Sequence, residues 1–203
     1  MDLFNSVCEA TKEAIEELEK ISGGDWPSSY GMAEYALSVP IAQKLYKKMQ
    51  EKISISFDEL YSRIWNWEFH RNDQHGSEEN PFHKSRARAD IALWSDRDKR
   101  LGCVEIKRKF EAASARKDLD RLCSASKHFG PDFQAFFVVF SSGNTSSDAQ
   151  TDQIYMLKEG RDGYAIKSRR VDVPSRSSPP RLANGITSPD ENAVAVVFQI
   201  KKA

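Results

Sequence analysis

The sequence predicts an α/β fold in which a central mixed β-sheet is flanked by helices on both faces. The expected elements follow the order helix, helix, strand, strand, strand, helix, strand, with further strands toward the end of the chain. The run Gln134–Phe140 is almost wholly apolar, which is typical of a strand buried on both faces. It follows an expected helix at 112–129, and a strand reached through such a crossover lies parallel to its predecessor. The sheet should therefore mix parallel and antiparallel pairs.

The first part of the chain is predicted to be helical. Residues 2–21 carry apolar side chains at helical spacing, and Gly23-Gly24 ends the pattern. A second helical pattern follows Ser28-Ser29, and Pro40 should kink that helix or begin a new one. The segment 56–59, Ser-Phe-Asp-Glu, has the capping-box pattern and is expected to open a short helix.

Three strands are expected next. In residues 65–69 Trp and Phe alternate with polar residues, which indicates a strand, and the polar segment 72–84 indicates a loop. Residues 86–94 and 101–108 are expected to form two strands joined by the polar turn 95–100.

After the central strand the pattern indicates smaller elements. We expect a loop at 141–152, a hairpin of 154–157 with 164–171, a surface loop at 174–189 and a last strand at 193–200. The 203 residues suffice for one domain with its own core. We expect a single domain over 1–203, with an N-terminal helical extension at 1–27, a core at 28–140 and added strands and loop at 141–203.

Charge is balanced overall but unevenly distributed. Thirty basic and thirty acidic residues cancel, yet residues 1–25 carry a net charge of −5 and residues 83–127 a net charge of +6. A neutral protein with a basic middle suits a polyanion that meets one face only, although charge runs are commonly solvated helix faces. No apolar run approaches the ~18 residues of a membrane span, and the first residues do not resemble a signal peptide. We expect a cytoplasmic protein with no membrane partner, in which Cys103 and Cys123 are reduced and buried.

The two strands at 86–94 and 101–108 bring together the residues that carry chemistry. If they pair symmetrically about their turn, opposed residue numbers add up to 195, so that Asp90 faces Glu105 and Arg88 faces Lys107. Because side chains alternate along a strand, Asp90, Glu105 and Lys107 share one face. The opposite face would be wholly apolar, formed by Ile91, Leu93, Val104 and Ile106.

Two directly opposed carboxylates repel each other, so something must compensate for their charge. A hard cation such as Mg²⁺, or Mn²⁺, is the natural candidate because it takes oxygen ligands from one or two carboxylates and keeps waters for a phosphate substrate. Lys107 beside them supplies a cation that can orient a metal-bound water or help to deprotonate it. Alternatively, Glu105 and Lys107 form an ordinary surface ion pair and Asp90 is a solvated strand residue.

Asp90 within Arg-Ala-Asp-Ile-Ala-Leu, followed by Glu105 and Lys107 within Val-Glu-Ile-Lys, resembles the signature of the PD-(D/E)XK nuclease superfamily. The resemblance spans roughly residues 28–140, because the order of elements also matches that superfamily's core of helix, three strands, helix and strand. It implies a restriction-endonuclease-like fold and a divalent-metal-dependent (endo)nuclease that hydrolyses phosphodiester bonds of DNA. In this role Asp90 and Glu105 bind the metal and Lys107 serves the attacking water. Ala89 departs from the name-giving pattern, which has Pro at that position.

The resemblance also implies a carboxylate from the first core helix, and Glu34 sits where that catalytic, metal-binding residue is expected. Glu68 is a rival for the same role, since its expected strand neighbours that of Asp90. Either glutamate could instead be an ordinary surface residue.

A basic cluster around this centre is expected to bind DNA, with RNA as the alternative. Arg86, Arg88, Arg108 and Lys109 flank the carboxylates, and the resemblance adds the helix residues Arg116, Lys117 and Arg121. Trp65, Trp67 and Trp94 could stack on bases, although strand spacing favours core packing for them.

Other readings remain open at this point. The chain could be a nuclease-like fold that no longer cuts and acts as a nucleic-acid-binding or interaction module, although every expected polar position is filled. The hairpin could also be a coincidence in an unrelated α/β protein. A homodimer is possible, with the helix at 1–21 as a candidate contact. The sequence leaves open the substrate structure, the choice between endo- and exonucleolytic cleavage, and the pathway.

Overall fold

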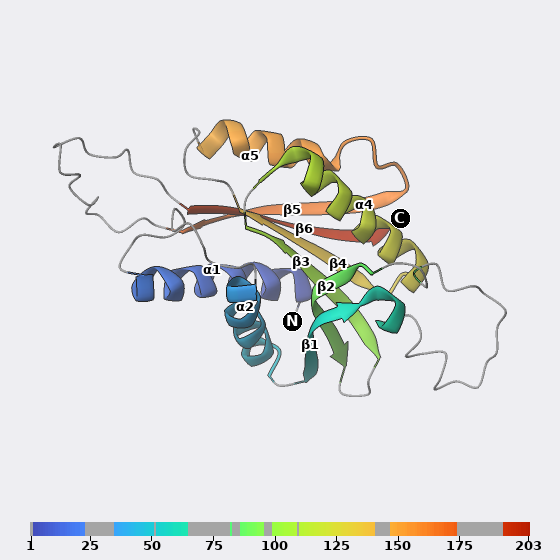
Figure 1. Cartoon of the computed structure of the whole chain (residues 1–203), viewed down its shortest axis with the longest axis horizontal. Helices are drawn as coiled ribbons and strands as arrows, with labels where there is room; N and C mark the ends of the chain where they lie inside the picture. The colour runs from blue at the N-terminus through green and yellow to red at the C-terminus, as the bar shows by residue number, and fades with distance from the viewer. Residues whose placement is uncertain are drawn as a thin grey trace.

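The protein is a three-layer α/β structure, seen in a computed structural model that describes residues 2–22, 35–50, 52–64, 82, 86–95, 99–108, 110–140, 147–173 and 193–203. The described helices are α1 (Leu3–Ser22), α2 (Tyr35–Lys48), α4 (Ala112–Phe129) and α5 (Ser147–Tyr155), the last continued by a 3₁₀ turn at Met156–Lys158. The strands are β1 (Ile53–Leu60), β2 (Arg88–Ser95), β3 (Arg100–Lys107), β4 (Gln134–Phe140), β5 (Tyr164–Val173) and β6 (Ala193–Lys202). α1 and α2 lie on one side of the sheet, and α4 and α5 lie on the other (Figure 1).

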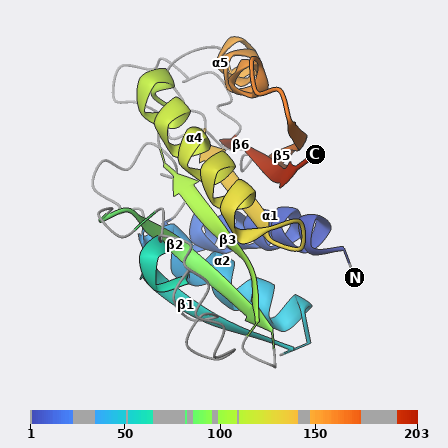
Figure 2. The same ribbon diagram turned by 90° about the vertical axis from the view of Figure 1, so that its right-hand side faces the viewer.

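The six strands form one mixed sheet in the order β1-β2-β3-β4-β6-β5. β3 and β4, which are joined through α4, run parallel to each other. The other four neighbouring pairs are antiparallel. Figure 2 shows the strong twist of the sheet between β1 and β5. The mixed α/β architecture with helices on both faces is therefore as the sequence predicts.

Two hydrophobic cores hold the layers together. The core under α1 and α2 includes Phe4, Ile15, Leu37, Ile41, Ile91, Val104, Val138 and Val197. The core under α4 and α5 includes Leu119, Leu122, Ile154, Ala92, Cys103, Phe137, Val139 and Phe198. Successive residues of β4 alternate between these two cores, which confirms the prediction that this strand is buried on both faces.

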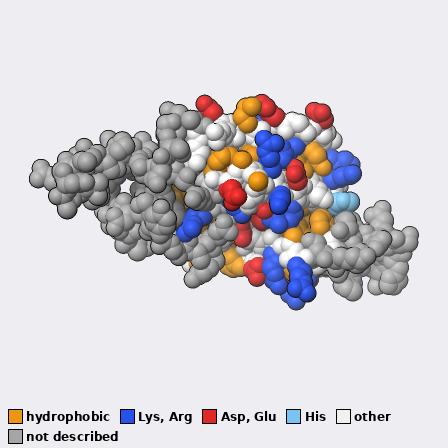
Figure 3. All heavy atoms as spheres, turned by 45° about the horizontal axis from the view of Figure 1, so that its top comes forward, with side chains coloured by type: hydrophobic (Ala, Val, Ile, Leu, Met, Phe, Trp, Pro, Cys, Tyr) orange, Lys and Arg blue, Asp and Glu red, His pale blue; other side chains and the backbone are white. Residues whose placement is uncertain are grey.

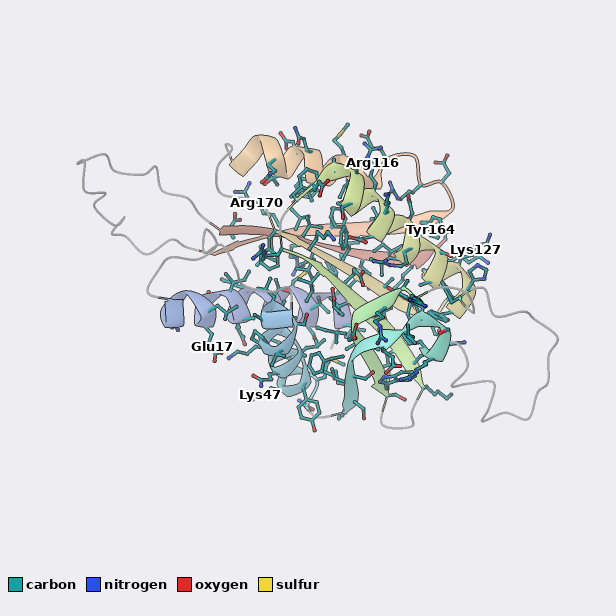
Figure 4. All side chains as sticks on the ribbon, viewed as in Figure 1. Glu17, Lys47, Arg116, Lys127, Tyr164 and Arg170 are labelled. Atoms are coloured by element: carbon teal, nitrogen blue, oxygen red, sulfur yellow. The ribbon has the colours of Figure 1, made fainter. Side chains whose placement is uncertain are left out.

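α1 packs against α2 and contributes its apolar side to the first core. Lys48 of α2 bonds to Glu9 at 3.1 Å and to Glu13 at 2.6 Å on the exposed side of α1. Glu17 and Lys47 are also exposed on these two helices (Figure 4). The apolar side of α1 is thus used in packing within the chain.

The segment 56–59 does not open a helix, contrary to the sequence prediction. It lies inside β1, where it pairs with β2 from Ile53–Ser95 to Leu60–Arg88, and helical structure begins only at residues 61–64. Ser56, Phe57 and Glu59 of this segment pair with β2, and tertiary pairing of this kind overrides a local capping signal.

Two predictions for the C-terminal part are also wrong. Residues 147–155, taken within an expected loop and strand, form α5, and residues 156–158 form the 3₁₀ turn. β5 therefore pairs with β6 and not with 154–157. Ile154 and Leu157 are buried in the second core, so their apolar character reflects helix packing.

Elsewhere the elements follow the prediction closely. The helices at Leu3–Ser22 and Ala112–Phe129 and the strand Gln134–Phe140 are confirmed, and the two hairpin strands differ from expectation by one or two residues at their ends. α2 continues through Pro40, which deprives the Ala36 carbonyl of one helical bond without ending the helix. The strand expected at 65–69 and the loop at 174–189 lie outside the described residues. In the part of the chain that is described, no helix is long and apolar enough to cross a membrane.

Candidate active site

β2 and β3 form the hairpin that carries the candidate residues. The predicted register is confirmed by three successive pairs: Ile91–Val104, Ala92–Cys103 and Leu93–Gly102. Asp90 and Glu105 would come next in this register, one step beyond the pair Ile91–Val104. The four residues expected on the opposite, apolar face all lie in the core under α1 and α2: Ile91, Leu93, Val104 and Ile106. The other face of the hairpin therefore turns toward α4.

The backbone is irregular around Asp90. Pairing of β2 with β3 ends at Ile91, and beyond it the Ile106 N–H donates a hydrogen bond to Asp90 Oδ2 at 2.6 Å. On the other side, Asp58 of β1 adopts a left-handed conformation with φ of 51°, and pairing resumes only at Glu59 and Ala89. A non-glycine residue with positive φ in a strand is uncommon and often marks a functional site. Asp90 therefore occupies a point where regular sheet pairing is interrupted on both sides.

Glu105 is buried, with 7% of its surface exposed. Its Oε1 accepts a hydrogen bond from Arg121 Nη2 of α4, and the same nitrogen donates to Asp118 Oδ1 at 2.7 Å. Burial raises the pKa of Glu105 to about 8; the Arg121 charge opposes this shift, and the charges of Asp90 and Asp118 add to it. Asp90 is thus close enough to influence Glu105 electrostatically, as the hairpin geometry predicts.

Lys107 ends β3 on the same face as Glu105. Its Nζ lies 3.0 Å from Asp118 Oδ2, and its side chain is 22% exposed. Asp118 therefore bridges the two cations of the site, Lys107 through one carboxylate oxygen and Arg121 through the other. The structure brings Asp90, Glu105 and Lys107 to one region, together with two charged residues of α4.

Asp118 was missed by the sequence reasoning, although a signal for it exists. It lies on the side of α4 that also buries Ala115, Leu119 and Leu122. A carboxylate on the apolar side of a helix is costly unless it is paired, so such a residue indicates a buried cation nearby. Arg121, three residues later, lies on the same side of the helix and was predicted as a DNA contact.

Next to Glu105 the site is lined by residues of the core under α4 and α5. Tyr61 is fully buried, and its hydroxyl lies 3.7 Å from Cys103 Sγ, the residue two positions before Glu105. Burial raises the pKa of both groups, so both are neutral at pH 7. This low-polarity surrounding strengthens the electrostatic interactions of Glu105.

The predicted DNA-binding residues are in varied surroundings. Arg88 donates to the main-chain oxygen of Asp58 at 2.6 Å and pairs with the Asp58 carboxylate at 3.1 Å. Arg86, Arg116 and Lys117 are exposed, Arg108 is half-buried, and Lys109 lies outside the described residues. Figure 4 shows Arg116 toward the start of α4.

The face that carries α4 and α5 has Lys and Arg side chains at several places with Asp and Glu between them (Figure 3). Charge on this face is therefore mixed among the described residues, and any phosphate-binding surface would be local. Trp94 is half-buried, packs on the core under α4 and donates to Ser56 Oγ at 3.0 Å, as expected of a packing residue. Trp65 and Trp67 lie outside the described residues.

Glu34 and Glu68, the two candidates for a further carboxylate, also lie outside the described residues. Among the residues that the structure does describe, no group of three or more His, Cys, Asp or Glu side chains is arranged to hold a metal ion. On the two strands of the hairpin itself, Asp90 and Glu105 are the two carboxylates that a metal ion could contact.

The donor set fits a hard divalent cation. Glu105 Oε2 is buried and has no hydrogen-bond partner among the described residues. Buried polar atoms are normally satisfied, so an unpaired carboxylate oxygen beside a second carboxylate suits a missing ligand. Mg²⁺ and Mn²⁺ accept such oxygen ligands. Arg121 already neutralises part of this charge, so the carboxylates do not depend on a metal for compensation.

Comparison with protein-family models, with curated proteins and with solved structures found no significant match for this chain. Function must therefore be argued from the site itself.

Proposed function

We propose that the protein is a divalent-metal-dependent nuclease of the PD-(D/E)XK type that hydrolyses phosphodiester bonds of DNA. The observation that carries the proposal is the convergence of Asp90, Glu105 and Lys107 at the point where β2 and β3 stop pairing. This combination of two acidic ligands and one lysine on one side of a hairpin is what metal-assisted phosphodiester hydrolysis requires.

The order of elements supports a restriction-endonuclease-like fold. The superfamily core of helix, three strands, helix and strand has its counterpart in α2, β1, β2, β3, α4 and β4. The first of the three strands is Ile53–Leu60, earlier in the chain than expected. α1, β5 and β6 extend this core on one side.

Each residue of the site has a defined task in this proposal. Asp90 and Glu105 would hold Mg²⁺ or Mn²⁺, and Glu34 is the proposed additional ligand. A bound metal supplies Lewis-acid chemistry, lowering the pKa of coordinated water and neutralising charge on the phosphate. Lys107 Nζ donates hydrogen bonds that orient the attacking water, and Asp118 fixes the position of this ammonium group.

Substrate binding falls to the basic residues around the carboxylates. Arg86, Arg116 and Lys117 present exposed cations that can contact backbone phosphates without reading sequence. Because cations that neutralise phosphates release counterions from the DNA, we expect binding to weaken steeply with salt.

The experiment is a cleavage panel with the purified full chain on duplex, single-stranded and branched DNA, with Mg²⁺, Mn²⁺ or chelator. Asp90→Asn is the sharpest variant, because its amide oxygen can still accept the Ile106 N–H while the charge is lost. The proposal predicts metal-dependent cleavage by the wild type and none by Asp90→Asn. Equal cleavage by both proteins would refute it.

One observation favours the alternative of a non-cutting nucleic-acid-binding module. Arg121 forms an ion pair with Glu105, and Lys107 forms one with Asp118. These two cations of the chain neutralise most of the negative charge of the site. The two functions separate on metal dependence: an enzyme should bind Mn²⁺ through Glu105 in calorimetry, whereas a module should bind DNA equally with and without metal.

A further inference from the structure

Arg121 holds an unusual place in the candidate site. A single nitrogen, Nη2, donates both to Glu105 Oε1 and to Asp118 Oδ1, at 2.7 Å in the second case. The side chain reaches from α4 to β3 and stands between the carboxylate proposed to bind metal and a second buried carboxylate.

The bonding of this group is incomplete. The guanidinium of arginine has five N–H donors in a fixed fork, but Arg121 Nε is buried without a hydrogen-bond partner among the described residues. Glu105 Oε2 is likewise buried without a hydrogen-bond partner among the described residues. A pair that was only structural would be expected to use these atoms, for example in a bidentate contact.

Charge shows why a metal and Arg121 cannot share Glu105 easily. With all three carboxylates ionised, the form that a metal ion binds, Asp90, Glu105 and Asp118 carry three negative charges against the two positive charges of Lys107 and Arg121. A divalent cation would turn this single negative excess into a positive one, in a largely buried site where like charges repel strongly. Release of Arg121 from Glu105 moves the guanidinium away from the metal ion and so reduces this repulsion.

We propose that Arg121 and the divalent metal are alternative partners of Glu105, so that metal entry releases the guanidinium to bind a DNA phosphate. Asp118 keeps Arg121 at the site during this exchange, because it lies one helical turn away and bonds the same nitrogen. The inference rests on the proposed function, and it makes metal binding and DNA binding mutually reinforcing.

The first test is calorimetric binding of Mn²⁺ to the full chain without DNA. Arg121→Gln removes the positive charge that competes with the metal for Glu105. The dissociation constant of this variant for Mn²⁺ should therefore be about tenfold lower than that of the wild type. Lys127→Gln, which changes an exposed basic residue of the same helix, is the matched control and should bind Mn²⁺ like the wild type. Arg121→Lys keeps the positive charge, so that its affinity should stay near that of the wild type.

The second test measures DNA binding by fluorescence anisotropy with Ca²⁺ or with chelator, with the oligonucleotide checked for integrity afterwards. The wild type and Lys127→Gln should bind DNA more tightly with the cation than without it. Arg121→Gln should lose that gain, because the group that the metal releases is absent. Circular dichroism and thermal unfolding of each variant identify a protein that has failed to fold; if Arg121→Gln fails, Arg121→Met, which keeps the aliphatic stem but not the charge, carries the comparison.

The outcomes separate the exchange from the proposed function. If Mn²⁺ binds the wild type and Glu105→Gln abolishes that binding, the metal site stands. If Arg121→Gln then binds Mn²⁺ no more tightly than the wild type, the exchange is overturned on its own. If neither the wild type nor Arg121→Gln binds Mn²⁺, the metal-dependent function fails, and the exchange fails with it.

Discussion

Lys107 Nζ and Asp118 Oδ2 lie 3.0 Å apart in a salt bridge that joins the last residue of β3 to the middle of α4. Both side chains are largely buried, at 22% and 10% exposure. The bridge fixes the one lysine of the candidate site in position, and Asp118 also bonds Arg121. From the sequence, α4 was expected to pack on the sheet and to contact phosphates. In the structure it also positions Lys107, the lysine that serves the attacking water in our proposal.

Asp118→Asn should destabilise the protein by about 2–4 kcal/mol, because it removes the shared counter-ion of two poorly solvated cations. Urea denaturation measures this change. Asp120→Asn is the control: Asp120 lies on the same helix and pairs with Arg161, but it is 66% exposed. Its loss should cost less than about 1 kcal/mol. Equal effects of the two substitutions would show that the Lys107–Asp118 bridge has no special energetic role.

The buried Glu105 makes the stability of the metal-free protein depend on pH. Burial raises its pKa from 4.5 to about 8, so between these values the folded chain retains a proton that the unfolded chain releases. Because the folded state binds more protons in this window, the contribution is complete below pH 4.5 and is lost as pH rises toward 8. From pH 5.5 to 8 the free energy of unfolding should fall by about 3 kcal/mol from this group.

Urea denaturation at several pH values, without metal, checks this dependence. Glu105→Gln has no proton to exchange, so that its free energy of unfolding should vary less over the same range. Parallel pH profiles for the two proteins would contradict the raised pKa.

The hairpin could be predicted from the sequence because its information is local. The apolar face of Ile91 and Val104 fixes which side chains point outward, and a short turn leaves little choice of register. β1 could not be predicted, since the capping-box residues 56–59 become strand only through pairing with β2. α5 was missed for a similar reason: Ile154 and Leu157 are apolar because they pack on the second core, a contact that no local pattern reveals.

In the candidate site, the hairpin residues could be predicted from the sequence and the roles of the helix residues could not. Asp90, Glu105 and Lys107 come from two strands adjacent in sequence, and their common face follows from alternation along a strand. The roles of Asp118 and Arg121 depend on where α4 crosses the sheet, which spacing along the chain does not determine. The prediction that a metal must offset the two carboxylates overlooked an arginine from that helix.

Gly102 is expected to tolerate no side chain. A Cβ at this position would lie 2.1 Å from the main-chain oxygen of Gln134 on the neighbouring β4. Gly102→Ala should therefore cost about 3 kcal/mol or more by forcing β3 and β4 apart. Gly163→Ala is the control, since a Cβ there meets nothing within 4 Å and only the positive φ opposes it. That conformation costs about 1–2 kcal/mol. Urea denaturation should show the larger loss at Gly102.

The three cysteines should resist thiol reagents in the folded protein. Cys8, Cys103 and Cys123 are buried, and all three are free. Burial raises the pKa of Cys8 and of Cys123 to about 11, and that of Cys103 further still. The reactive thiolate is therefore scarce at pH 8. Reaction with a chromogenic disulfide should be slow in buffer and complete for three thiols in urea; rapid native reaction at any of them would contradict this burial.

The most direct measurement of the central claim is single-turnover cleavage of duplex DNA with Mn²⁺ by the wild type, Lys107→Ala and Lys127→Ala. Lys127 lies exposed toward the end of α4 and controls for the loss of a basic residue on that helix (Figure 4). We expect the wild type and Lys127→Ala to cleave at similar rates. Lys107→Ala should be slower by about 100-fold or more, because the group that orients the attacking water is lost. Cleavage by Lys107→Ala at the wild-type rate, or no metal-dependent cleavage by the wild type, would contradict the account.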